Sequence, residues 1–116
     1  MSGFSVSRLN HAVLYVRSAK GAAEFYAKAF GFVIAGEEFA GKAIFMRAAT
    51  TENHHDLGLF EVGPEAPRAA RGSTGLYHLA WEVSSIRDLA AAAQTLGELG
   101  ALTGASDHGV SKSLYG

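Results

Sequence analysis

GLYHLAWEV, at residues 75–83, is an apolar stretch rich in residues that favour β-strands, and a single histidine, His78, lies in its interior. The stretch RLNHAVLYV, at residues 8–16, has the same shape, with His11 directly before a short apolar run that contains a tyrosine. Apolar residues at three- and four-residue steps follow each stretch, which is typical of an amphipathic helix. The chain therefore looks like one structural unit written twice, with a histidine at the same place in each copy.

The composition indicates one compact domain, because the 116 residues are 48% hydrophobic and only 18% charged. The net charge of -1 and the lack of a basic cluster interleaved with aromatic residues disfavour nucleic acid and membrane surfaces as partners. The chain has no cysteine, which excludes disulfides and thiolate metal sites and fits a reducing compartment. No apolar run approaches the roughly 20 residues that span a bilayer. We therefore expect a soluble, cytoplasmic protein with a small-molecule substrate.

The first copy, at about residues 6–62, has the pattern of a strand, a helix and three further strands. Alternation over residues 6–16 predicts the first strand. The apolar spacing over residues 19–30, with Ser18 before it and Gly31 after it, predicts a capped helix. Turn-forming residues divide the remainder into strands at 32–39, 42–49 and 55–62. The first copy therefore has a βαβββ order.

The second copy, at residues 75–116, follows a polar linker at residues 63–74 that has no apolar period. Its helix is predicted at residues 85–98, with Ser85 as the capping residue. Strands are expected at 75–83, near 101–105 and at 110–115. Only part of the three-strand run is present, and both copies together are expected to form a single domain, residues 1–116.

These elements predict an α+β fold in which two βαβββ units pair around a metal cleft. Each unit leaves one sheet face that its helix does not cover, and pairing the units buries both faces. Equivalent positions then meet, so His11 and His78 come together although they are far apart in the sequence. A lone histidine in a strand is more often a packed core or edge residue. Two histidines at matching positions suit a divalent metal, and a carboxylate would complete the facial ligand set typical of non-haem Fe(II).

A further histidine segment, NHHDLGLFEV, occupies residues 53–62. Strand alternation predicts that His55 lies on the same face as Leu57, Leu59 and Glu61. In a cleft, His55 would be an acid/base group and Glu61 a carboxylate ligand. The segment by itself is also typical of a polar turn that enters a strand, with Glu61 as a charge at the strand end.

The C-terminal segment adds His108 and Tyr115. By themselves these are a loop residue and a strand residue with ordinary polar contacts. Beside a bound metal they would form a pair of hydrogen-bond donors for an anionic oxygen of a substrate.

The chain resembles the vicinal-oxygen-chelate superfamily, which includes glyoxalase I, bleomycin-type antibiotic-resistance proteins and type I extradiol dioxygenases. The resemblance covers nearly the whole chain. It is carried by the two histidine stretches, by EFYAKAFGF at residues 24–32 and by the paired βαβββ order. It implies a protein that acts on or binds a small molecule.

Three details are similar to the extradiol dioxygenase branch. The resemblance implies that His11 and His78 bind the metal and that His55 is the acid/base residue. It also implies that His108 and Tyr115 hold the substrate. The implied reaction is the cleavage of a catecholic ring with O₂; Fe(II) is the favoured metal, with Mn, Ni or Zn as the other candidates.

One departure from the branch concerns the third metal ligand. The branch places a carboxylate on its last strand after a turn, and the sequence reaches Gly116 before such a turn. We therefore expect this ligand beyond Gly116, in a longer natural chain, with Glu61 as the alternative.

Two other functions stay open. A glyoxalase-like isomerase or lyase would use another divalent metal, with Glu61 as a ligand. A metal-free resistance-type protein would sequester a planar ligand between aromatic residues, although the number of histidines argues against it. A homodimer is expected, because short sheets closed around a cleft leave free edges that a second chain can cover.

Overall fold

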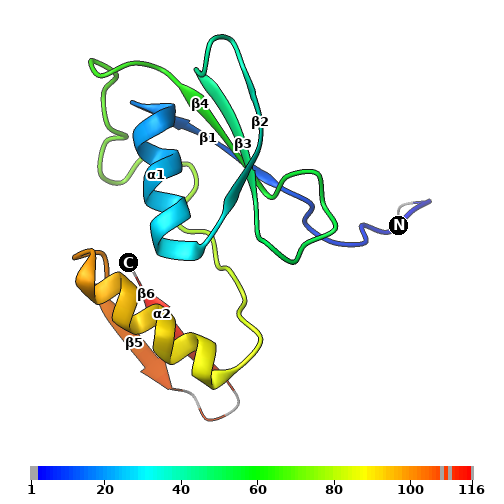
Figure 1. Ribbon diagram of the computed structural model, residues 1–116, viewed down its shortest axis with the longest axis vertical. Helices are drawn as coiled ribbons and strands as arrows, with labels where there is room; N and C mark the ends of the chain where they lie inside the picture. Colours follow the sequence, from blue (N-terminus) through cyan, green and yellow to red (C-terminus); the bar gives the residue numbers. More distant parts are fainter. Residues whose placement is uncertain (1–2, 108, 110, 116) are drawn as a thin grey trace. The chain divides into compact units, whose positions relative to one another are not determined.

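The computed structural model describes residues 3–107, 109 and 111–115, and the chain forms two compact units, Met1–Ala66 and Pro67–Gly116 (Figure 1). The boundary between the units falls inside the linker predicted at residues 63–74. Both helices and strands are present in each unit, so the predicted α+β class is confirmed. None of the helices in the described part of the chain is long and apolar enough to cross a membrane.

The first unit has the predicted βαβββ order. Its elements are β1 (Ala12–Val16), α1 (Ala19–Phe30), β2 (Val33–Glu38), β3 (Ala43–Arg47) and β4 (Leu57–Glu61). The four strands form one sheet in the order β1-β4-β3-β2, in which β1 runs parallel to β4 and the other pairs are antiparallel.

The first strand is shorter than the strand predicted for residues 6–16. It begins at Ala12 because its parallel partner β4 begins at Leu57, and Ala12 lies opposite Leu57 in the register. The residues before Ala12 have no residue of β4 beside them with which to pair. The prediction was therefore wrong for residues 6–11, where apolar alternation occurs without a pairing partner.

Local signals at both ends of α1 explain why the predicted helix is confirmed. The Ser18 side chain accepts a hydrogen bond from the Gly21 N–H at 3.0 Å, which satisfies one of the free donors of the first turn. Gly31 has a φ of 67°, and this left-handed conformation, which glycine adopts without steric cost, ends the helix.

The core of the first unit lies between α1 and one face of the sheet. Met46, Leu57 and Leu59 are fully buried there, and α1 contacts both β3 and β4. Strand alternation sends the intervening side chains to the opposite face, which α1 does not cover (Figure 1). We call this second face the open face; it includes Val13, Tyr15, Phe45, Gly58 and Phe60.

The second unit contains α2 (Ile86–Glu98) packed against a hairpin. The hairpin strands are β5 (Gly104–Asp107) and β6 (Lys112–Tyr115), which pair antiparallel. The predicted helix and its cap are confirmed, because the Ser85 side chain accepts a hydrogen bond from the Asp88 N–H at 3.1 Å. The predicted strands near 101–105 and at 110–115 are present but begin two to three residues later.

The strand predicted for residues 75–83 is not formed in the structure. Its residues favour strands, but a strand also needs an edge with which to pair. In the described residues of this unit the available strands, β5 and β6, are four residues each and pair with one another. Such a short edge does not match a nine-residue strand, and Leu76 and Tyr77 are exposed.

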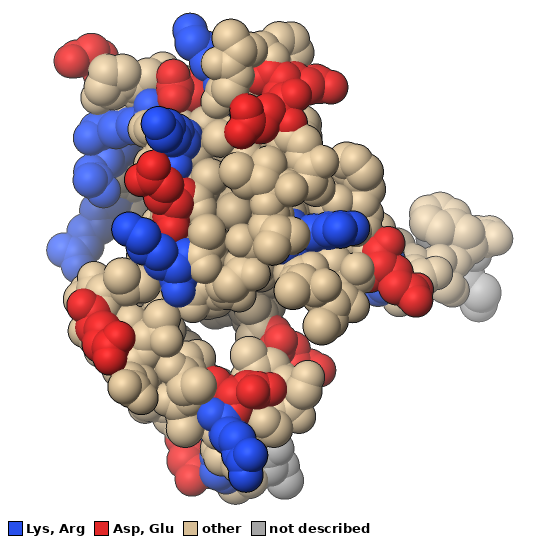
Figure 2. All heavy atoms as spheres, viewed as in Figure 1, with Lys and Arg blue, Asp and Glu red and all other residues tan. Residues whose placement is uncertain are grey.

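Charges of both signs occur on the surface in view, where Lys and Arg side chains lie among Asp and Glu side chains (Figure 2). This mixture agrees with a net charge of -1 for the chain. No single sign of charge covers that face.

Candidate functional site

Three histidines and one phenylalanine gather at one end of the first unit's sheet. The ring centroids of His11 and His55 are 4.5 Å apart, those of His55 and Phe45 are 5.0 Å apart, and those of His54 and His55 are 5.3 Å apart. His11 directly precedes β1 and His55 precedes β4 by two residues. Because these two strands are parallel neighbours, the residues before them meet at the same end of the sheet.

The prediction that His55 shares a face with Leu57, Leu59 and Glu61 is wrong. Leu57 and Leu59 are buried in the core, and Glu61 Oε1 accepts a hydrogen bond from the Ala19 N–H at 3.0 Å. His55 instead contacts Phe45, which lies on the open face. A side chain added at Gly58, on the same face, would also contact Phe45. Alternation fails because the chain bends between His55 and the start of β4.

A buried carboxylate ties the segment that carries His55 to the segment that carries His11. The Asp56 side chain accepts hydrogen bonds from the Ala48 N–H at 2.8 Å and from Asn53 Nδ2 at 2.7 Å. Asn53 Nδ2 also donates to the Asn10 carbonyl oxygen at 3.1 Å. Charge-assisted bonds of this kind are strong in a buried setting, so Asp56 and Asn53 fix the two histidines beside one another.

Sequence reasoning assigned no role to Asn53 or Asp56 beyond a polar turn. Asp56 is only 8% exposed, although aspartate is rarely buried without partners. A signal was present: a carboxylate stands directly between a histidine and the first apolar residue of a strand, where its side chain has to be satisfied locally. The partner Asn10 could not be found in this way, because it lies in a distant part of the sequence.

The hydrogen bond of His11 fixes which of its ring nitrogens carries the proton. His11 Nδ1 lies 2.7 Å from Asn10 Oδ1, which can only accept. Nδ1 is therefore the donor, and the neutral ring keeps a lone pair on Nε2. Ligating histidines in metal sites typically have this arrangement, in which an outer partner orients the ring through its other nitrogen.

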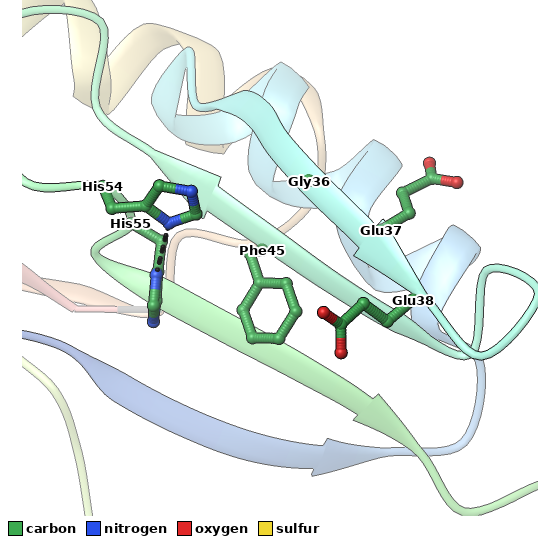
Figure 3. A pocket seen from close by; sticks show the side chains of 6 residues that line it. All are labelled: Gly36, Glu37, Glu38, Phe45, His54 and His55. Atoms are coloured by element: carbon green, nitrogen blue, oxygen red, sulfur yellow. Dashed lines mark hydrogen bonds between the residues drawn. The ribbon is translucent and has the colours of Figure 1, made fainter.

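The surroundings of His55 favour its neutral form. Burial lowers the pKa of His55 below its ordinary value, and the neighbouring His11 and His54 lower this pKa further against a smaller opposing effect of Asp56. His54 Nδ1 and His55 Nδ1 are 3.0 Å apart, so one of them donates and the other accepts (Figure 3). His55 is therefore a neutral imidazole at pH 7, which is the form that can take up a proton.

His54 and His55 line a shallow depression of about 350 Å³ in the first unit. It is lined by Gly36, Glu37, Glu38, Phe45, His54 and His55 (Figure 3). Gly36 leaves space where β2 borders the depression, because a Cβ added at Gly36 would meet nothing within 4 Å. A volume at this scale admits one small aromatic ring.

The remaining predicted site residues lie in the second unit. His78 is exposed, and its ring lies beside that of Tyr77 in a tilted arrangement with centroids 5.5 Å apart. The Tyr115 hydroxyl lies 3.2 Å from Ser106 Oγ, and His108 lies outside the described residues. The meeting of His11 with His78 stays a prediction. Within the part of the chain that the structure describes, no set of three His, Asp or Glu side chains is placed to hold a metal ion.

Comparison with known proteins identifies the class. The model of the glyoxalase/bleomycin resistance protein/dioxygenase superfamily matches residues 8–115, so the chain belongs to this superfamily. None of the curated proteins matches the chain significantly.

Solved structures share the fold. The chain is similar to a lactoylglutathione lyase from Agrobacterium tumefaciens, with a TM-score of 0.67 and 17% identity over 95% of this chain and 84% of that one. It is also similar to a possible glyoxalase from Bacillus cereus, with a TM-score of 0.59 and 22% identity over 87% of this chain and 80% of that one. An integron cassette protein from the mobile metagenome of V. cholerae has a TM-score of 0.59 and 21% identity over 96% of this chain and 84% of that one.

Proposed function

We propose that this member of the superfamily is a metal-dependent enzyme that acts on an aromatic small molecule with two adjacent oxygens, and that its reaction is extradiol-type ring cleavage. The observation that carries the proposal is the contact of His11 with His55 on the open face. One of these histidines has a free Nε2 suited to a metal, and the other is held neutral and suited to move a proton.

His11 offers one nitrogen that is suited to a divalent metal. Its Nε2 lone pair is free, and its Nδ1–H is oriented by Asn10. By the repeat in the sequence, His78 would be the second ligand, and Fe(II) is favoured over Mn, Ni or Zn by the dioxygenase-like histidine segment. When bound, such a metal would act as a Lewis acid that lowers the pKa of a substrate hydroxyl.

The chain's own residues would then bind the ring and handle its protons. Phe45 offers an aromatic face beside His55, and the apolar open face excludes water from one side of the substrate. Neutral His55 would accept a hydroxyl proton, and its contact with His54 Nδ1 offers a route along which that proton can be shared.

A glyoxalase-like isomerase or lyase is the second candidate, and the structural likeness to a lactoylglutathione lyase favours it. This chemistry would use Glu61 as a metal ligand. Glu61, however, accepts the Ala19 N–H at the start of α1, where the helix dipole also stabilises a carboxylate. That engagement supports the dioxygenase proposal over the glyoxalase-like one.

The test combines metal loading with O₂ uptake. Protein loaded anaerobically with Fe(II), Mn, Ni or Zn is given either a catechol with O₂ or lactoylglutathione without O₂. We expect O₂ uptake with the catechol and the Fe(II) form. Breakdown of lactoylglutathione without O₂ uptake would favour the second candidate, and tight binding of a planar ligand without turnover in any form would favour the resistance-type alternative.

His55→Gln supplies the matched variant for this test. It should keep its metal while turnover falls about 10²- to 10⁴-fold, the range that a general acid/base group contributes. Because the pKa of His55 lies below its ordinary value of about 6.5, wild-type kcat/KM should stay high through neutral pH and fall only in more acidic solution. A variant that loses its metal would instead identify His55 as a ligand.

A further inference from the structure

Two charged residues of β2, Glu37 and Glu38, line the depression, and the sheet register places only the Glu38 side chain on the open face. In the sheet register Glu38 lies opposite Ala43, and Ala43 lies opposite Phe60. Residues opposite one another on neighbouring strands point to the same face, which places Glu38 on the open face with Phe60. Figure 3 shows its carboxylate directed toward the Phe45 ring.

Glu37, the adjacent carboxylate, points the other way. It lies opposite Ile44, which is buried on the helix side of the sheet, and a Cβ added at Gly41 would come within 3.9 Å of Glu37 Oε2. Figure 3 shows the Glu37 side chain directed away from Phe45. Glu38 and Glu37 therefore carry the same carboxylate group in opposite directions: that of Glu38 is directed toward Phe45 and that of Glu37 away from it.

The lining of the depression leaves the charge of Glu38 uncompensated. Among the described residues, no hydrogen bond or ion pair engages the Glu38 carboxylate. No Lys or Arg belongs to the lining of the depression. A cation placed between Glu38 and the face of Phe45 would gain an ion pair and a cation–π contact, whereas an anion would be repelled.

We propose that Glu38 makes this site selective for ring substrates that carry a positively charged side chain, such as a catechol with an aminoalkyl substituent. This inference rests on the proposed function for the position of the ring, with its two oxygens at the histidines. The substituent opposite those oxygens then extends along β2 toward Glu38. Aromatic carboxylates, which would bring a second negative charge to the same place, are disfavoured.

The test is a binding comparison with three catechols that differ only in one side chain: aminoethyl, ethyl and carboxyethyl. Dissociation constants are measured by calorimetry on the full chain without added metal or O₂, so the result does not depend on turnover. The wild type should bind the aminoethyl compound most tightly and the carboxyethyl compound most weakly. Glu38→Gln should weaken binding of the aminoethyl compound about three- to tenfold, as expected for a partly exposed charge. The same variant should leave the dissociation constant of the ethyl compound unchanged.

Two control variants locate the effect. Glu37→Gln removes the same charge from a lining residue whose side chain lies on the other side of the strand, and it should change the three affinities much less than Glu38→Gln does. Gly36→Leu adds a side chain at a lining position where a Cβ would meet nothing within 4 Å, and it should abolish binding of all three compounds. An equal effect of the Glu37 and Glu38 variants would overturn the inference, because it would show a diffuse charge effect.

The inference and the proposed function can fail separately. Selective binding that Glu38→Gln removes would support the inference even if no catechol is turned over. Turnover of catechols with no preference among the three side chains would support the proposed function and overturn the inference. Failure of all three compounds to bind would overturn it as well.

Discussion

The two histidine stretches have the same sequence shape, yet only one of them forms a strand. Residues 12–16 pair with β4 in the first unit, whereas residues 75–83 form no strand in the second. The first stretch meets a five-residue partner, and the second shares its unit with two strands of four residues that pair with each other. The difference teaches that β-propensity marks a candidate strand, while the length of an available edge decides whether it forms.

Hydrogen exchange tests this comparison most directly. The Ala12 N–H donates to the Asp56 carbonyl oxygen at 3.1 Å, and alternate amides of β1 continue that parallel ladder. Those amides should exchange about 10³-fold more slowly than the amides of residues 76–80, which have no strand pairing. Protection of residues 76–80 equal to that of β1 would mean that the second stretch is paired in solution, and the contrast between the units would disappear.

Metal titration tests whether the equivalent histidines of the two copies, His11 and His78, both bind the metal. His11→Ala and His78→Ala should each lower metal affinity at least about 100-fold, since loss of a ligand exceeds the 10- to 100-fold cost of losing an outer-shell partner. His54→Ala is the control, because His54 neighbours the site and is not a proposed ligand. A drop in His11→Ala alone would show that the second unit does not contribute, and unchanged affinity in both variants would remove the two-histidine site.

The sequence allows prediction of what local chemistry determines. Ser18, Gly31 and Ser85 determine the ends of the two helices, and the helices form where their spacing predicts them. The approach of His11 to His55 follows from the parallel pairing of β1 with β4, which the structure shows and the sequence patterns did not predict. Local patterns could not give the face of His55, because one bend at Asp56 cancels the alternation.

The network from Asp56 through Asn53 to Asn10 was also beyond sequence reasoning. It depends on the register between β1 and β4, which a single sequence does not specify at the level of individual hydrogen bonds. The partner of His78 is not determined by local patterns for the same reason. Sequence spacing can pair two equivalent positions, but only packing brings their side chains together.

Two aspartates, one in each unit, allow the two units to be compared by the free energy of unfolding. Asp56→Ala should lower the free energy of unfolding by about 1 to 3 kcal/mol, because the Ala48 N–H and the Asn53 amide lose the Asp56 carboxylate as their acceptor in a partly buried setting. Asp107→Ala in the second unit should have a far smaller effect, since Asp107 pairs with Lys112 on an exposed hairpin. Chemical denaturation of both variants measures the difference. Equal effects would show that the Asp56 network does not stabilise the first unit.

The smallest expected effect concerns the two helix caps. Ser18→Ala and Ser85→Ala each remove one side-chain acceptor for a first-turn N–H, at a cost of about 1 kcal/mol. The consequences should differ, because α1 buries Ala19, Ala23 and Ala29 against the sheet, whereas α2 buries only Leu96 among the described residues.

A helix with little tertiary packing depends more on its local signals. Ser85→Ala should therefore reduce helix content measured by circular dichroism in native buffer, whereas Ser18→Ala should lower only the denaturation midpoint and leave native helix content unchanged. Ser84→Ala is the matched control, because Ser84 precedes the capping residue and its substitution should alter the free energy of unfolding by only a few tenths of a kcal/mol. Equal loss of helix content in the Ser18 and Ser85 variants would show that tertiary packing supports the two helices to the same degree, and the contrast between the units would then be confined to their strands.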